Sequence, residues 1–511
     1  MVRLSELGVR EKAGLVLAPL AFVGAGFGLS SGLEYQARWA LGVGLAMAVL
    51  WITESIPLWV TALFPLLLFP MFGIGSFGGL LLEYFDPVNF LFMGGMMLAA
   101  SLEEWNVHQR IALGMVAKIG TSPRRIVLGF MLTTAFLSLW ISNTAAAVML
   151  FPIGMAVLGE FKQHPGATPQ EVRRLGLTLM LGIGYAASIG GIGCKIGTGT
   201  NLVFVKQSAQ VLSHEVSFLA WFKVGLPVVL IALPLAWLYL VRVAAPLSAL
   251  PFPGAAEIVA TRRAALGRMS RGEVLSLLGF SSAALLWVFR QEMDFGAFRI
   301  PGWSALVPNH WAQLGTSLPE PLKGLFGPRG GESVVALAMV LLLMLLPAGG
   351  GRQVLSLKAA SGINWGILLL LGGGFAMASG ITQSGLTKVL TQALHDIHDV
   401  PPLLALIGIC LFTTGLSEVA SNTATASMLL PVLASAAPHL GLSTGIAMFA
   451  ATLAASFGFM LPAGTPPNAV VFSSGYIPVT SMVKAGLVVD LVGSTVIALV
   501  CYFLAPWALG Y

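Results

Sequence analysis

The stretches SNTAAAVMLFPI (142–153) and SNTATASMLLPV (421–432) decide the fold that this sequence predicts. Each begins with the polar triplet Ser-Asn-Thr, lies inside apolar sequence and continues with the pattern Ala-x-Ala-x-Met-Leu-x-Pro. Aligned at an offset of 279, residues 138–152 and 417–431 are identical at nine of fifteen positions. Such agreement indicates an internal repeat rather than two unrelated segments.

The composition is that of a membrane protein. Hydrophobic residues make up 57% of the 511 positions, charged residues make up 9%, and the mean hydropathy is +0.88. Water-soluble domains carry about 25% charged residues. Apolar runs that approach or exceed the roughly 17–25 residues needed to span a bilayer occur at 13–30, 39–54, 57–73, 88–107, 175–190, 222–245, 274–290, 333–348, 362–383, 443–460 and 484–508. The predicted class is an all-α polytopic membrane protein with about 11 transmembrane helices in a lipid bilayer.

The basic residues indicate the topology. If the N-terminus is cytoplasmic, eleven spans leave the C-terminus outside, and most of the 27 Lys and Arg residues fall in inside loops. This is the distribution expected of a multi-pass protein of the cell inner membrane. The net charge of +6 therefore reports topology and does not indicate a nucleic-acid partner. The densest basic loop, TRRAALGRMSRGE (261–273), marks the boundary between predicted halves 1–260 and 261–511.

Each half pairs a polar triplet with a later interruption. The triplets lie near the midpoints of the apolar stretches 126–158 and 402–436, which we interpret as re-entrant hairpins. The interruptions are SIGGIGCKIGTGTN (188–201) and SFGFMLPAGTPPN (456–468), where Gly and Pro break the predicted spans 175–206 and 443–475. Five predicted spans separate the two triplets, an odd number, so the halves form an inverted repeat.

The hairpin tips carry chemistry suited to a small anion and a small cation. Helix ends expose unpaired N–H and C=O groups, and these favour anions and cations respectively. Ser and Thr hydroxyls and Asn amides add neutral oxygens for a hard cation and donors for a carboxylate. In inverted-repeat transporters such sites form near the bilayer midplane. A lone Ser-Asn-Thr would be explained as well by hydrogen bonds within or between helices, but a symmetric pair favours a binding site.

The two triplets, the two interruptions and the stretch WITESIPLWVTALFP (51–65) resemble the divalent anion/sodium symporter family over nearly the whole chain. The resemblance implies an elevator-type carrier that forms a homodimer and moves a small dianion, usually with sodium. The substrate classes implied are C4-dicarboxylates such as succinate, malate or fumarate, and citrate or sulfate.

Carried over residue by residue, the resemblance also implies the ligands. The sodium sites would use Ser138, Ser142, Asn143 and Gly197 in the first half, and Ser417, Ser421, Asn422, Gly464 and Asn468 in the second. The anion would be held by Asn143, Thr144, Thr198, Gly199, Asn422, Thr423, Thr465 and Pro466. Sodium is thus the expected co-transported ion, and no catalytic residue is expected.

The first interruption departs from the family pattern. Cys194 and Lys195 replace a Thr-Leu-like pair, and Thr200 stands where Pro is common. The ammonium of Lys195 is a possible substitute for the first sodium ion, since anion exchangers of this family work without sodium. Two alternatives therefore stay open, a sodium symporter and a sodium-independent exchanger of the same fold. Snorkelling of Lys195 to the aqueous edge is a third explanation.

Other ionisable residues in apolar surroundings have structural explanations. We expect Glu54 at a tight turn between spans and Asp490 as a hydrogen-bonding residue between helices. Glu418 either faces the site or caps the hairpin. His395 and His398 have metal-like spacing but lie in a polar loop without further ligands.

Two other function classes fit less well. The sequence contains no His-Glu-x-x-His, Gly-x-Ser-x-Gly or Walker motif, so an embedded enzyme is not favoured. A channel is the third option, and inverted repeats with hairpins on both faces favour alternating access over it.

Overall fold

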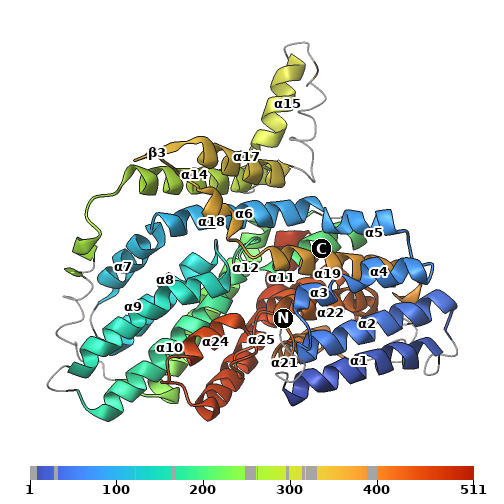
Figure 1. Cartoon of the computed structure of the whole chain (residues 1–511), viewed down its shortest axis with the longest axis horizontal. Helices are drawn as coiled ribbons and strands as arrows, with labels where there is room; N and C mark the ends of the chain where they lie inside the picture. The colour runs from blue at the N-terminus through green and yellow to red at the C-terminus, as the bar shows by residue number, and fades with distance from the viewer. Residues whose placement is uncertain are drawn as a thin grey trace.

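The computed structural model describes residues 8–27, 33–120, 122–163, 167–213, 215–247, 260–261, 263–294, 299–313, 317, 331–387, 389 and 400–510. These residues are mostly helical and include two short β hairpins (Figure 1). Seven helical segments in this part of the chain are long and apolar enough to cross a membrane: 35–53, 77–104, 143–163, 218–244, 271–288, 365–383 and 479–509. A mostly helical protein with several membrane-capable helices, as predicted, is therefore confirmed, while the number of about 11 crossings and the re-entrant hairpins stay predictions.

The first half contains helices over all its predicted spans. They are α1 (Val9–Phe27), α2 (Tyr35–Thr53), α3 (Leu58–Thr61), α4 (Phe64–Met71), α5 (Phe77–Tyr84), α6 (Pro87–Glu104), α7 (Val107–Ile119), α8 (Pro123–Ser138), α9 (Asn143–Gln163), α10 (Pro169–Gly191), α11 (Gly199–Val211), α12 (Phe218–Tyr239) and the π-helix η2 (Leu240–Ala244). Local sequence sets several starts. Thr168 and Glu171 form a capping box at α10, and the Thr168 N–H lowers the pKa of Glu171.

The second half adds the remaining elements. They are α14 (Arg271–Val288), β1 (Met293–Asp294), β2 (Arg299–Ile300), α15 (Trp303–Gln313), α17 (Gly331–Leu345), β3 (Pro347–Gly349), β4 (Arg352–Gln353), α18 (Leu357–Ser361), α19 (Trp365–Gln383), α21 (Pro402–Ser417), α22 (Asn422–Ala436), the 3-10 helix η3 (Ala437–Leu440), α23 (Thr444–Ala454), α24 (Pro466–Phe472) and α25 (Val479–Leu509). Strands β1 and β2 pair antiparallel, as do β3 and β4.

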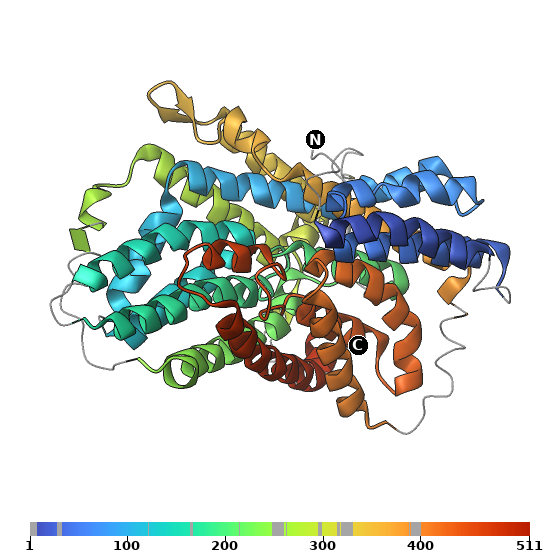
Figure 2. The ribbon, with the colours of Figure 1, turned by 60° about the horizontal axis from the view of Figure 1, so that its bottom comes forward.

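Each Ser-Asn-Thr triplet lies where one helix ends and the next begins. Helix α8 ends at Ser138 and α9 begins at Asn143, while α21 ends at Ser417 and α22 begins at Asn422. Arms α8 and α9 pack against each other, as do α21 and α22. In Figure 1 the teal first pair, α8 and α9, lies at the left of the molecule and the second pair, α21 and α22, lies near its centre; Figure 2 shows the orange second pair to the right of centre.

Both predicted interruptions are irregular in the structure. Helix α10 ends at Gly191 and α11 begins at Gly199, whereas α23 ends at Ala454 and α24 begins at Pro466. Consecutive glycines weaken the first helix, and Pro462, Pro466 and Pro467 cannot continue the second. Residues 192–197 and 455–459 of these non-helical segments are buried. Such backbone is tolerated at membrane depth only when protein or a water-lined cavity surrounds it.

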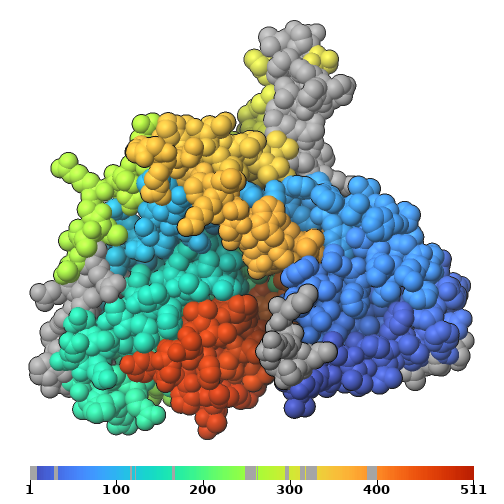
Figure 3. Space-filling view, in the orientation of Figure 1, coloured from blue at the N-terminus to red at the C-terminus, as the bar shows by residue number. Residues whose placement is uncertain are grey.

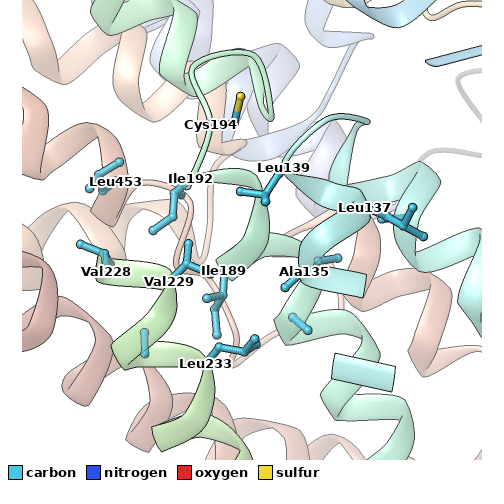
Figure 4. Close-up of a cluster of buried hydrophobic side chains, with 14 of the residues drawn as sticks. Ala135, Leu137, Leu139, Ile189, Ile192, Cys194, Val228, Val229, Leu233 and Leu453 are labelled. Carbon is cyan, nitrogen blue, oxygen red and sulfur yellow. The ribbon is translucent and has the colours of Figure 1, made fainter. Parts of the chain in front are cut away.

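The core joins the two halves. Around the first interruption, side chains from four helices meet: Ala135 and Leu137 of α8, Ile189 of α10, Val228, Val229 and Leu233 of α12, and Leu453 of α23 (Figure 4). Leu453 belongs to the second half and is fully buried. In the space-filling view, a red-orange part of the second half lies between the teal and blue parts of the first (Figure 3). The tips are thus built on a shared core rather than on two separate domains.

Several elements differ from the sequence predictions. The predicted span 57–73 is two short helices, α3 and α4, with Pro65 in the first turn of the second. Helices α5, α7, α15 and α18 and the β hairpins were not predicted, because short amphipathic segments give no membrane-length signal. His395, His398 and Arg262 lie outside the described residues.

Candidate functional site

The first tip is fixed by the hydroxyl of Ser138. Its single hydrogen is shared between two acceptors, the amide oxygen Oδ1 of Asn143 at 2.9 Å and the carbonyl oxygen of Ala187 in α10 at 2.6 Å. Ser138 is fully buried and Asn143 is 9% exposed. Gly191 leaves room for this amide, since a Cβ there would lie 2.1 Å from Asn143 Oδ1. The start of α9 is thereby held against the end of α10.

The second tip repeats this arrangement. The hydroxyl of Ser417 donates to Asn422 Oδ1 at 2.9 Å and to the carbonyl oxygen of Ala455 at 2.5 Å. Ala455 directly follows α23, just as Ala187 lies near the end of α10. The sequence repeat is therefore also a repeat of hydrogen bonds.

The two interruptions are closed by equivalent asparagines. The Asn201 amide Nδ2 donates to the carbonyl oxygens of Gly191 at 3.0 Å and Cys194 at 2.8 Å. The Asn468 amide donates to those of Gly458 at 2.8 Å and Leu461 at 3.0 Å. In both loops the acceptors lie ten and seven residues before the asparagine. The loops are therefore compact, and their geometry is set by the same residue type.

Backbone oxygens gather beside each tip. A Cβ on Gly197 would lie 2.3 Å from the carbonyl oxygen of Gly191 and 2.9 Å from that of Ser138. A Cβ on Gly464 would lie 3.2 Å from the carbonyl oxygen of Gly458 and 3.3 Å from that of Leu461, and 3.1 Å from the carboxylate oxygen Oε2 of Glu418, which has no counterpart in the first half. With the asparagine Oδ1 atoms, these carbonyls supply neutral hard oxygens. Such a donor set suits a hard monovalent cation better than a thiophilic metal.

The hydroxyls next to the interruptions are not used as helix caps. Thr198 precedes α11 and Thr465 precedes α24, both in extended conformation and without a side-chain cap hydrogen bond. The Thr465 hydroxyl is buried and has no hydrogen-bond partner in the described part of the chain. Ser142 caps α9 by accepting from the Ala145 N–H at 3.2 Å, whereas Ser421 makes no such bond.

The first interruption adjoins the second tip. A Cβ on Gly199 would lie 3.4 Å from the hydroxyl oxygen of Thr423, so α11 of the first half begins against α22 of the second. Helix α24 packs in turn against α9 and α10. The structure thus assembles three groups of predicted ligands: Ser138, Asn143 and Gly197; Ser417, Asn422, Gly464 and Asn468; and Gly199 with Thr423. Thr144 is half-buried in the first turn of α9, and Pro466 is exposed at the start of α24.

Residues 15–508 match the family described as "Sodium:sulfate symporter transmembrane region". The chain belongs to this symporter family. A sodium-dependent dicarboxylate transporter SdcS from Staphylococcus saprophyticus is 35% identical over 508 residues, covering 98% of this chain and 93% of the relative. Its counterpart from Staphylococcus aureus strain MRSA252 is 36% identical over 503 residues, covering 97% of this chain and 92% of the relative. Membership of a symporter family makes this chain a membrane transporter and not an enzyme.

Solved structures agree on the fold. The Neisseria gonorrhoeae MtrF structure has a TM-score of 0.51 and 15% identity, covering 98% of this chain and 95% of that one. The Alcanivorax borkumensis YdaH transporter has a TM-score of 0.50 and 14% identity, covering 84% of this chain and 88% of that one. At this identity the likeness concerns the overall fold alone.

Lys195, in the first interruption, makes its polar contacts with residues outside the two tips. Its ammonium donates to Glu332 Oε2 at 2.6 Å and to the carbonyl oxygen of Val216 at 2.8 Å, and it lies 5.3 Å from the Phe218 ring centroid. The residue is 4% exposed, so it does not snorkel to water. Sequence reasoning missed Glu332, although an isolated glutamate just before the apolar run 333–348 was the available signal.

Carboxylates hold the second interruption of this symporter. Glu418 accepts from the N–H groups of Met460 at 2.8 Å and Leu461 at 3.1 Å, and Asp490 of α25 accepts from Phe459 at 3.4 Å. Glu418 thus bonds the loop rather than capping its own hairpin. The first half carries Leu139 at the equivalent position, so the repeat is not symmetric here.

Two other residues complete the surroundings. Glu54 ends α2 with a left-handed φ of 51°, which agrees with the predicted tight turn. Arg10 of α1 donates to the carbonyl oxygens of Ile52 and Val419, so the start of α1 reaches the turn of the second tip. Sequence reasoning missed Arg10, because nothing local connects it with a turn 409 residues away.

Proposed function

We propose that the chain is a sodium-coupled symporter that carries a small dianion across the cytoplasmic membrane. The observation that carries this proposal is the doubled oxygen site, in which each tip presents the same Ser–Asn hydrogen bond beside a carbonyl-rich loop. The relatives named sodium-dependent dicarboxylate transporters make C4-dicarboxylates such as succinate, malate or fumarate the first candidates. Citrate and sulfate are the next candidate substrates. Sulfate is included because the description of the family names it.

In this proposal one sodium ion binds at each tip. The first uses oxygens of Ser138, Ser142, Asn143 and Gly197, and the second uses those of Ser417, Ser421, Asn422, Gly464 and Asn468. The bound cations would supply the positive charge that attracts the dianion into the membrane. The side chains of Ser138 and Ser417 hold the asparagine amides with Oδ1 beside the loop carbonyls.

The anion would bind between the tips through donors rather than a fixed charge. The proposed ligands are Asn143, Thr144, Thr198, Gly199, Asn422, Thr423, Thr465 and Pro466. Support comes from the uncapped threonines before α11 and α24 and from the contact of Gly199 with Thr423 across the two halves. Hydroxyls and amides donate to both ends of a small dianion, so each carboxylate can be satisfied by one half.

The proposed movement is of the elevator type. The site residues lie in what we name the site module, α8–α12 with η2 and α21–α25, whose helices pack against one another across the two halves. The frame comprises α1–α6 and α14–α19. The two triplet-bearing pairs, 126–158 and 402–436, would act as re-entrant hairpins of inverted halves 1–260 and 261–511. We further propose a homodimer, as the family resemblance implies, with a cytoplasmic N-terminus and an outside C-terminus, as the distribution of Lys and Arg over the predicted loops indicates.

The sodium-independent exchanger remains the competing function. It would require the Lys195 ammonium to act in place of the first sodium ion. In the structure that charge is balanced by Glu332, which favours the symporter.

Uptake into sealed proteoliposomes tests the proposal. Labelled succinate, citrate and sulfate are supplied with an inward sodium gradient, an inward potassium gradient, or no gradient. We expect succinate uptake that requires sodium. Equal uptake in potassium, stimulated by unlabelled succinate inside the vesicles, would instead identify an exchanger, and no uptake of any dianion would reject the function.

A further inference from the structure

Two lysines of the site module, Lys195, which is buried, and Lys206, which is partly buried, reach across to the frame. Lys195, in the first interruption, pairs with Glu332 at the start of α17 at 2.6 Å. Lys206 of α11 pairs with Asp86, which caps α6, and with Glu83 of α5 at 3.3 Å. The four side chains of Lys195, Lys206, Glu332 and Asp86 are between 5% and 15% exposed. Each pair therefore joins a residue beside the site to a residue of the frame.

A cavity lies beside these ion pairs. It has a volume of about 100 Å³ and is lined by Lys195, Lys206, Asp86, Glu332 and Arg290, among others. Arg290 adds a weaker contact with Glu332 at 3.7 Å. The cavity is lined by apolar residues such as Val88, Leu91 and Val205 as well as by these charges, so the ion pairs add to the apolar packing between module and frame.

The cluster has no excess of positive charge. Three cations, Lys195, Lys206 and Arg290, face four carboxylates, Asp86, Glu332, Glu83 and Glu215, so nothing here would recruit an anion. A second anion site is therefore not the best explanation. Removing one member of a buried pair leaves the other uncompensated, which makes such pairs effective at holding a single arrangement.

We propose that the Lys195–Glu332 and Lys206–Asp86 pairs form an ionic latch that holds the site module against the frame in the conformation described here and opens in each transport cycle. The inference rests on the proposed function, since it assumes that the module moves relative to the frame. Lys195 is then a positioning residue. This role explains why a lysine is buried near the proposed first cation site while its ammonium contacts Glu332 instead.

The test follows alkylation of one introduced cysteine. Ala209→Cys, on α11, lines the cavity, and a water-soluble maleimide is added to the full chain in nanodiscs without sodium or substrate. The native cysteines 194, 410 and 501 are buried, so the chain without Ala209→Cys supplies the background. Opening of the boundary widens the cavity and exposes this position, so the alkylation rate reports separation of module and frame.

Lys195→Met is the informative variant, because Glu332 keeps Arg290 as a partner. We expect its alkylation rate to rise about tenfold, which corresponds to a loss of one such pair in the closed state. Lys195→Arg, which keeps the charge, should stay within about twofold of the parent. If Lys195→Met is not monodisperse, Lys206→Met applies the same test to the second pair.

Arg352→Met is the matched control. Arg352 pairs with Glu104 at 3.1 Å, but both residues belong to the frame, so its loss should leave the alkylation rate unchanged. Parental rates in both Lys195→Met and Lys206→Met would overturn the latch. Because no substrate is present, this outcome is distinct from a failure of sodium-dependent uptake, which would reject the proposed function instead.

Discussion

Replacement of Asn143 by Ala tests the equivalence of the two tips in detail. The variant removes the Oδ1 that accepts from Ser138 at 2.9 Å and that lies closest to the Gly191 backbone. Ser138 keeps its bond to Ala187, so the tip should still fold. The variant lacks one neutral oxygen of the proposed cation site and one donor to the anion. The loss weakens the free energy of binding by about 1–3 kcal/mol.

That cost converts to a rise of about fivefold to roughly 150-fold in the sodium concentration needed for half-maximal uptake. Asn422→Ala should give a loss of similar size, since Ser417 and Asn422 form the same 2.9 Å hydrogen bond. The assay is initial succinate uptake against sodium concentration, with Ser361→Ala as control, because Ser361 is an exposed α18 residue remote from the tips. Near-normal uptake by either asparagine variant in well-folded protein would refute the two-tip site.

Three further outcomes are expected. Gly191→Ala should abolish most uptake, because its Cβ would lie 2.1 Å from Asn143 Oδ1. Gly159→Ala is the control and should leave uptake unchanged, because its Cβ would meet nothing within 4 Å. Equal uptake by the two variants would contradict the packing argument. Acetate and lactate should compete with succinate at least about tenfold more weakly than malate, since paired donors favour a dianion, and equal competition would count against them. Glu418→Ala should lower the unfolding free energy by about 1–3 kcal/mol, by freeing two backbone N–H groups of the second interruption, and an unchanged melting temperature would rule this out.

The sequence predicted the parts of the fold that repeat. The triplets, the glycine and proline interruptions and their pairing leave strong local signals, and the structure has helix ends at Ser138, Asn143, Ser417 and Asn422. The hydrogen bonds of Asn201 and Asn468 add a symmetry that the sequence spacing already contained.

The long-range partners were not predictable. Glu332 lies 137 residues from Lys195, and no pattern in a single sequence connects them. The role of Lys195 was therefore inferred from the residues next to it in the sequence. These residues suggested that its charge lies beside the first cation site. Short elements such as α5 were not predicted for a different reason. Eight residues carry too little periodicity to distinguish a helix from a loop.

The central claim is that two equivalent oxygen sites bind sodium and thereby drive uptake of a dianion. The most direct measurement is the initial rate of succinate uptake into proteoliposomes as a function of external sodium at constant ionic strength. The account predicts a sigmoidal curve with an order in sodium above one in the parent chain, and no uptake when choline replaces sodium. A rate that is independent of sodium, or that saturates as a simple hyperbola unaffected by Asn143→Ala, would contradict it.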